Sequence, residues 1–174
     1  MRTYLLAAVV LAGCSRAPAP AAGTLAANDF ENLAGWLADS PAQATLTQLQ
    51  AHSGKYSTSA GPGHDYSLGY SNLLSRMTAD RPIRLRISAW VQQTGSEPSP
   101  KLVTELKSPQ GGSLLWEGLD VGTVAKAPGK WYRVEQIVAL PATAPPDSRL
   151  LVYLWRADST TPTYLDDLEI ATAP

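Results

Sequence analysis

The stretch Arg84-Leu85-Arg86-Ile87-Ser88-Ala89-Trp90-Val91-Gln92 decides the fold class, because two kinds of residue alternate along it. Its four aliphatic residues fall on one face of an extended chain, and the arginines, the serine, the glutamine and the tryptophan fall on the other. This period of two is typical of a half-buried β-strand. Since Trp90 shares its face with polar residues, we expect its ring outside the core, either as a ligand platform or as a cover over a sheet edge.

Short β-type runs follow one another along the rest of the chain, separated by turns rich in Gly and Pro. From residue 28 onward no helical period persists for three turns, and there is no internal repeat. We expect strands over residues 44–50, 56–60, 66–77, 82–93, 101–107, 113–117, 131–140, 149–156 and 164–171. Strands at this spacing predict an all-β fold, a two-sheet antiparallel β-sandwich.

The first residues have the build of a secretion signal. Arg2 precedes an apolar segment over residues 4–11, and Ala12, Gly13 and Cys14 follow at once. Residues 15–27 are rich in Ala and Pro and read as an extended tether. We therefore expect a signal peptide over residues 1–13, a modified cysteine and tether over 14–27, and a β-sandwich domain over 28–172.

Leu11-Ala12-Gly13-Cys14 resembles a bacterial lipobox. The resemblance implies that Cys14, the single cysteine of the chain, carries a diacylglycerol and becomes the first residue of the mature protein. It also implies a location in the bacterial cell envelope, on the periplasmic or surface side, with the acyl chains as membrane anchor. The alternative is an ordinary signal peptide with a chance cysteine.

Composition narrows the class of partner. Hydrophobic residues make up 44% and charged residues 17%, which suits a packed core. The net charge of -1, without a basic stripe, argues against a nucleic-acid partner. The chain has 5 Trp and 7 Tyr but 1 Phe, and rings with a polar edge favour a binding surface. The alternative for any one of these Trp residues is core filling.

Five motifs resemble, in order along the chain, those of jelly-roll carbohydrate-binding modules of families four, nine and twenty-two, which have a galactose-binding-like fold. They are Asn28-Asp29-Phe30-Glu31 with Gly35-Trp36, the turn over residues 51–57, Ile87-Ser88-Ala89-Trp90-Val91, the Gly-x-Trp strand at 129–134, and the closing strand at 164–170. The matches span residues 28–171. The resemblance implies a jelly roll with Greek-key connections.

Modules of this kind commonly hold a structural calcium ion, and the resemblance implies one here. It would place carboxylate oxygens from Glu31 and Asp166 and main-chain carbonyls from Asp29 and Lys55 around the ion. Such an oxygen set suits a hard cation. The alternative is that Asp166 caps a turn and that Glu31 is solvated.

The resemblance also implies a concave sheet that binds a sugar chain. Flat rings stack on the apolar faces of sugars, and polar side chains bond to their hydroxyl rims. We expect Arg86, Trp90, Tyr153 and Trp155 to line this surface, with Gln92 and Tyr70 as second choices. We expect Trp36 and Trp131 to pack, and the sequence leaves Trp116 open.

No constellation in the sequence indicates an enzyme. His52 lies in a turn and His64 in a loop, there is no Gly-x-Ser-x-Gly motif, and strand alternation would separate Asp166 from Asp167. The leading hypothesis is a lipid-anchored, non-catalytic module that binds a polysaccharide or glycoconjugate. The alternatives are a structural or adhesion lipoprotein whose aromatic residues meet an envelope protein partner and, more weakly, a glycan-acting hydrolase.

Overall fold

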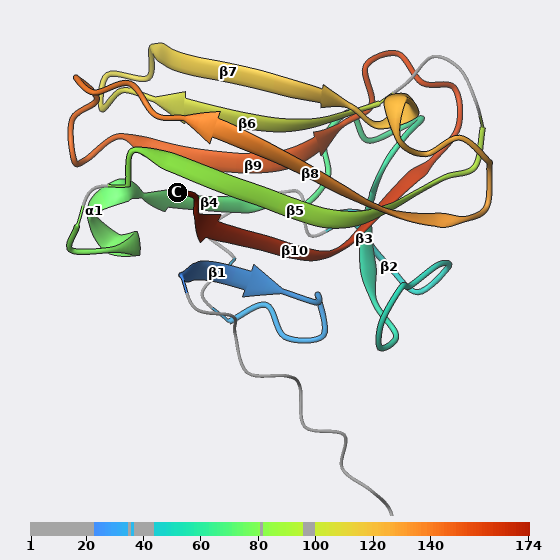
Figure 1. Cartoon of the computed structure of the whole chain (residues 1–174). Helices are drawn as coiled ribbons and strands as arrows, with labels where there is room; N and C mark the ends of the chain where they lie inside the picture. Colours follow the sequence, from blue (N-terminus) through green and yellow to red (C-terminus); the bar gives the residue numbers. More distant parts are fainter. Residues whose placement is uncertain (1–22, 35, 37–43, 81, 96–99) are drawn as a thin grey trace, which may run out of the picture.

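The computed structural model describes residues 23–34, 36, 44–80, 82–95 and 100–174, and it has two antiparallel sheets (Figure 1). One sheet has six strands, in the order β2-β3-β10-β5-β8 with β1 also paired to β10: β1 (Thr24–Asn28), β2 (Leu46–Thr47), β3 (Ser57–Ala60), β5 (Arg84–Gln93), β8 (Trp131–Ala139) and β10 (Thr163–Thr172). The other has the order β4-β9-β6-β7: β4 (Tyr70–Leu73), β6 (Lys101–Lys107), β7 (Ser113–Asp120) and β9 (Arg149–Trp155). The predicted all-β sandwich is confirmed.

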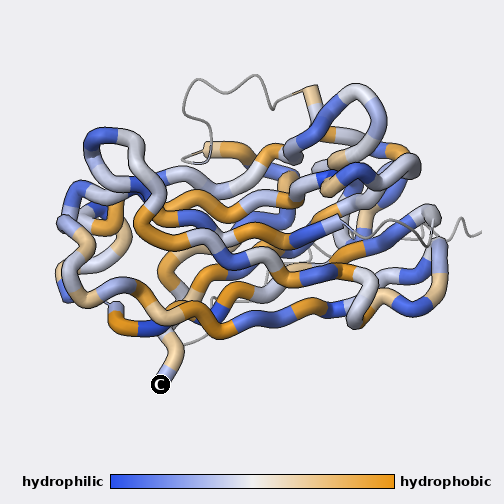
Figure 2. The backbone as a smooth tube through the Cα atoms, turned by 90° about the horizontal axis from the view of Figure 1, so that it is seen from above, coloured by the Kyte–Doolittle hydropathy of each residue, from blue (hydrophilic) through white to orange (hydrophobic). Residues whose placement is uncertain are grey.

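The core lies between the two sheets and follows the alternation of the strands. On β5 the four aliphatic residues of the quoted stretch are all buried, which confirms that strand. Leu102 and Leu106 of β6 and Leu150 and Leu154 of β9 are fully buried in the facing sheet. Figure 2 shows the same alternation of hydrophobic and hydrophilic residues along the strands. Burial of these side chains is the main stabilising contribution to the sandwich, at about 1.5–3 kcal/mol each.

The structure differs most from the sequence-based expectation at three places, and β7 also extends beyond the expected residue 117, to Asp120. β1 begins at Thr24, inside the expected tether, because its backbone pairs with β10, as at Asn28 and Leu168. β2 is reduced to two residues. The expected strand over residues 66–77 is shorter and runs into a one-turn helix, α1 (Leu74–Met77), because its pairing with β9 ends at Leu73.

The signal segment, Cys14 and residues 15–22 of the tether lie outside the described residues. Within the part that the structure describes, no helix is long and apolar enough to cross a membrane.

Candidate functional site

The residues expected to bind ligand separate onto two different sheets. Arg86, Trp90 and Gln92 lie on β5 of the six-stranded sheet, whereas Tyr153 and Trp155 lie on β9 of the four-stranded sheet. In both strands the alternating neighbours of these residues fill the shared core, so the two sets point away from it on opposite sides. The expectation that they line one concave surface is therefore wrong.

Tyr70, a second choice for ligand contact, is a core residue with 6% of its surface exposed. Its ring packs edge-to-face against Trp36, with the ring centroids 5.2 Å apart, and Trp36 packs in the same way against Phe30 at 6.1 Å. The predicted packing role of Trp36 is confirmed. Burial raises the pKa of the Tyr70 phenol. Tyr70 therefore forms part of the floor beneath a site rather than an open contact surface.

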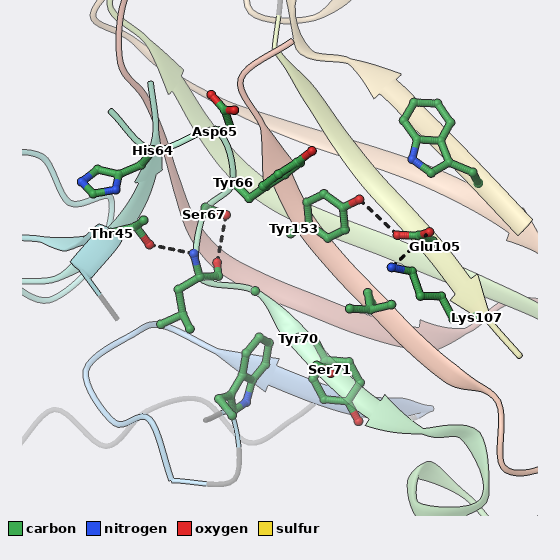
Figure 3. Close-up of a pocket in the computed structure, with 15 residues that line it drawn as sticks. Thr45, His64, Asp65, Tyr66, Ser67, Tyr70, Ser71, Glu105, Lys107 and Tyr153 are labelled. Carbon is green, nitrogen blue, oxygen red and sulfur yellow. Dashed lines mark hydrogen bonds and ion pairs between the residues drawn. The ribbon is translucent and has the colours of Figure 1, made fainter. Parts of the chain in front are cut away.

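A groove of about 740 Å³ crosses the outer face of the four-stranded sheet, a size typical of ligand sites (Figure 3). It runs from the segment before β4, across β9, to β6 and β7. The strands bring residues from distant parts of the sequence into one row, since Leu151 pairs with both Ser71 and Glu105 and Glu105 pairs with Trp116. The side chains and glycine that line it are Trp36, Thr45, His64, Asp65, Tyr66, Ser67, Leu68, Gly69, Tyr70, Ser71, Glu105, Lys107, Trp116, Leu151 and Tyr153.

Four aromatic rings mark this face and form two edge-to-face pairs. Tyr66 packs against Tyr153 with centroids 5.5 Å apart, and Trp116 packs against Trp155 at 6.1 Å. Tyr66 and Trp116 are the exposed members, at 54% and 46% of their surfaces. Gly118 leaves the space that the Trp116 ring occupies, because a Cβ there would lie 2.7 Å from the indole. The groove thus offers two exposed rings, each supported by a second ring.

Tyr66 and Trp116 were not predicted as site residues. Tyr66 precedes β4 and joins the face through a single bridge to Trp155, so no strand period identifies it. Trp116 follows two leucines, and this apolar run leaves open which face of the strand its ring occupies. Tyr66 belongs to the site because it pairs with a distant strand, and Trp116 because β7 joins β9 through β6; local patterns encode neither arrangement.

Fixed polar groups lie beside the rings. The Tyr153 hydroxyl donates to Glu105 Oε2 at 3.2 Å, and Lys107 Nζ lies 3.7 Å from Glu105 Oε1 (Figure 3). Burial, together with the negative charge of Glu105, raises the pKa of Tyr153 to about 12, so the phenol stays protonated and remains a donor. A carboxylate with two held partners is a preorganised hydrogen-bond acceptor for a ligand hydroxyl.

One wall of the groove depends on Gly69. A Cβ at this position would lie 2.1 Å from the Val152 carbonyl oxygen and 2.9 Å from the Tyr153 Cα, so only glycine permits this approach to β9. The neighbouring Ser67 Oγ accepts from Leu154 N at 3.0 Å and fixes the same segment to β9. This close approach holds Tyr66 against Tyr153.

The outer face of the six-stranded sheet carries a different aromatic cluster. The His52 ring stacks on Trp90, with centroids 4.0 Å apart and planes 13° apart, and Trp131 meets His52 edge-on at 5.6 Å. Gln92 is buried and its Nε2 donates to Gly129 O at 3.2 Å. Arg86 is half-buried on the same face. Trp90 is therefore itself covered by the His52 ring, which neither of its two predicted roles describes, and Trp131 packs as predicted.

The turn after β2 is held by two carboxylates from distant segments. Asp166, which has no exposed surface, accepts from His52 N at 2.8 Å and Ser53 N at 3.1 Å through Oδ2, and from Asp167 N at 2.7 Å through Oδ1. Glu31 Oε1 accepts from Lys55 N and Tyr56 N of the same turn, both at 2.6 Å. Burial raises the pKa of Asp166 to about 6. Asp166 thus caps the turn, and Glu31 is bonded to it rather than solvated alone.

These carboxylates bear on the predicted calcium ion. Among the described residues, no group of three His, Cys, Asp or Glu side chains could hold a metal ion. The side-chain oxygens that could serve as metal ligands at the turn are those of the Glu31 and Asp166 carboxylates. Asp29 Oδ1 instead accepts from Glu31 N at 3.1 Å. The chemistry of two carboxylates suits a hard cation, but main-chain oxygens, such as those predicted from Asp29 and Lys55, would have to complete the shell.

The predicted separation of Asp166 and Asp167 is wrong. The register of β10 shifts between Asp166 and Glu169, and Asp167 has a φ of 47°, so both carboxylates reach the same turn. Asp167 accepts from Ser53 Oγ at 2.7 Å and lies 2.6 Å from His52 Nδ1. A nucleophilic serine must donate to histidine, whereas Ser53 donates to the aspartate. This cluster therefore lacks the order of a serine-hydrolase triad.

Comparison with known proteins supports the fold. No model of a known protein family matches the chain, and no curated protein matches it in sequence. A family 22 xylan-binding domain of Xyn10C from Paenibacillus barcinonensis is 21% identical, with a TM-score of 0.54 over 89% of this chain and 97% of that domain.

Two further structures of family 22 modules are similar. The tandem modules of the same Xyn10C are 24% identical, with a TM-score of 0.56 over 90% of this chain and 48% of that one. A Clostridium thermocellum xylanase 10B fragment, complexed with xylohexaose, is 18% identical, with a TM-score of 0.53 over 87% of this chain and 29% of that one. The domain thus has the jelly-roll sandwich fold of carbohydrate-binding modules.

Proposed function

We propose that this protein binds a polysaccharide chain, non-catalytically, in the groove on the outer face of the four-stranded sheet. The observation that carries the proposal is the pair of exposed rings, Tyr66 and Trp116, held on either side of the fixed Tyr153–Glu105 hydrogen bond. The xylan-binding domain of similar fold supports the same class of ligand and makes xylan the first polysaccharide to test.

The chemistry of the groove matches that of a sugar chain. Pyranose rings have C–H faces that stack on aromatic rings, and equatorial hydroxyls that bond to charged and polar groups. Trp116 provides the larger ring, and Glu105 provides an acceptor whose position is fixed by Tyr153 and Lys107. Because each exposed ring is supported by a second one, little side-chain entropy is lost on binding.

Electrophoresis of the purified protein through gels that contain soluble xylan, mixed-linkage β-glucan or no polysaccharide tests this function. We expect retardation in at least the xylan gel and no release of reducing sugar from it. Unretarded migration in every gel, together with a specific envelope partner recovered by crosslinking, would replace glycan binding with the interaction-protein alternative. Sugar release would show a hydrolase.

We further propose that the mature protein is anchored to the cell envelope through a lipid on Cys14. The single cysteine directly after two small residues supports this modification. With Cys14→Ala, we expect loss of partitioning into the detergent phase of Triton X-114 and accumulation of the unprocessed precursor. The matched control is Ser15→Ala, which leaves the cysteine in place and should behave as wild type. Detergent partitioning of the Cys14→Ala protein would contradict lipidation.

Calcium is proposed as a structural ion at the turn held by Glu31 and Asp166. A ligand that binds only the folded state at about 100 times its Kd adds about 2.7 kcal/mol. For a domain of this size, that corresponds to a rise in melting temperature of about 5–10 °C. We expect this rise with 1 mM CaCl₂ over 1 mM EGTA, and its loss in Glu31→Gln. Equal melting temperatures of the wild type in both buffers would remove calcium from the account.

A further inference from the structure

Two cations lie side by side at one end of the candidate groove. Lys107 of β6 and Arg149 of β9 are register partners, and both belong to the alternating set that faces away from the core. Directly opposed residues of neighbouring strands have Cβ atoms about 4.5–5.5 Å apart, and like charges there destabilise a sheet. Lys107 and Ser71 both line the groove. Arg149 Nη1 donates to Ser71 Oγ at 3.2 Å.

The charge balance of this end differs from that of the rest of the face. Two other cations on this face each have their own carboxylate: Arg156 Nε lies 2.7 Å from Asp65 Oδ1, and Lys101 Nζ lies 3.4 Å from Asp120 Oδ2. At the Lys107 end, Lys107 Nζ lies 3.7 Å from Glu105 Oε1, whereas Arg149 is hydrogen-bonded to an uncharged hydroxyl. Among the described residues at this end of the groove, the two cations thus have one ion-paired carboxylate, and it is bonded to Lys107.

We propose that Lys107 and Arg149 bind a carboxylate substituent of the glycan, so that the groove prefers a uronic-acid-bearing polysaccharide over its neutral counterpart. The inference rests on the proposed function and adds a specificity to it. The planar guanidinium of Arg149 can bond both oxygens of a carboxylate, and Lys107 adds a point charge beside it. A bound anion would also relieve the repulsion between the two cations. The aromatic rings would bind the uncharged backbone of the same chain.

The test compares glucuronoxylan with the same polysaccharide after chemical reduction of its carboxyl groups, by affinity electrophoresis and titration calorimetry. Two exposed charge pairs are each worth about 0.5 kcal/mol, so we expect about five-fold tighter binding of the native form at low salt. The preference should shrink in 0.5 M NaCl, because exposed charges are screened. In Lys107→Gln/Arg149→Gln, the preference should be lost, so that the native and the reduced form bind with equal affinity.

Lys101→Gln is the matched control, because this lysine lies on the same face but is paired with Asp120. It should keep the preference for the native form. If wild type binds both forms equally, or if the double variant loses affinity for both forms equally, carboxylate recognition is wrong while glycan binding stands. If neither form is bound, the function proposed for the groove fails, and the inference fails with it.

Discussion

Replacing Trp116 by alanine should weaken xylan binding at least ten-fold and leave the fold intact. The indole is 46% exposed at the border of the groove, where it lies against Trp155 and above Gly118. Truncating a central aromatic contact typically costs about 2 kcal/mol or more, and 1.4 kcal/mol is a factor of ten in affinity. Titration calorimetry with xylohexaose and with soluble xylan measures the change. The double variant Trp116→Ala/Tyr66→Ala should remove measurable binding.

Trp90→Ala provides the matched control, because it deletes the same side chain from the opposite side of the sandwich. Its ring is covered by His52 and lies in the other sheet, so we expect unchanged affinity. The loss of the stacked pair should lower the stability of the protein instead, which a melting curve reports. Unchanged affinity in Trp116→Ala combined with lost affinity in Trp90→Ala would move the binding site to the six-stranded sheet.

The second large effect concerns Asp166, whose substitution by alanine should cost about 3 kcal/mol or more of unfolding free energy. The side chain has no exposed surface and accepts three backbone N–H bonds, from His52, Ser53 and Asp167. Each buried donor left unsatisfied costs about 1–3 kcal/mol. We expect a fall in melting temperature of about 6–12 °C. Urea unfolding in the presence of EGTA measures this cost separately from any effect of calcium.

Asp147→Ala serves as the control for Asp166→Ala, since Asp147 is an exposed aspartate in the turn before β9. Exposed substitutions of this kind typically change stability by less than 0.5 kcal/mol. Asp166→Asn should be intermediate, because its amide keeps one acceptor oxygen for the turn. A urea midpoint for Asp166→Ala equal to that of the wild type would show that the turn does not need this carboxylate.

Local patterns in the sequence predicted the fold well, because short β-type runs, some of them clearly alternating, are separated by turns rich in Gly and Pro. β6 begins and ends where the sequence placed it, at Lys101 and Lys107, and β5 has the predicted inward and outward faces. The ordered set of motifs, whose fold the structural neighbours share, predicted the jelly roll as well. A strand that is buried on one side leaves a pattern of apolar and polar residues in its own sequence, and ten residues are enough to show that pattern.

The site was harder to predict, because the pairing of strands and their assignment to sheets is non-local. Trp90 and Trp155 are both indoles at outward positions of their strands, yet they lie in different sheets. Tyr66 reaches the groove through one bridge, made possible by the close approach at Gly69. The shift of register after Asp166 likewise overrides simple alternation and brings Asp167 to the turn. None of these three outcomes has a periodic signature in the sequence.

The most direct measurement of the central claim follows the indole N–H signals of the ¹⁵N-labelled protein by NMR during titration with xylohexaose. Substitution of each Trp in turn assigns the signals. The account predicts large shifts or broadening of the Trp116 signal, with a smaller change at its ring partner Trp155, while the Trp90 and Trp131 signals stay in place. Movement of the Trp90 signal with the Trp116 signal unchanged would contradict the account, since the sugar would then be bound on the opposite sheet.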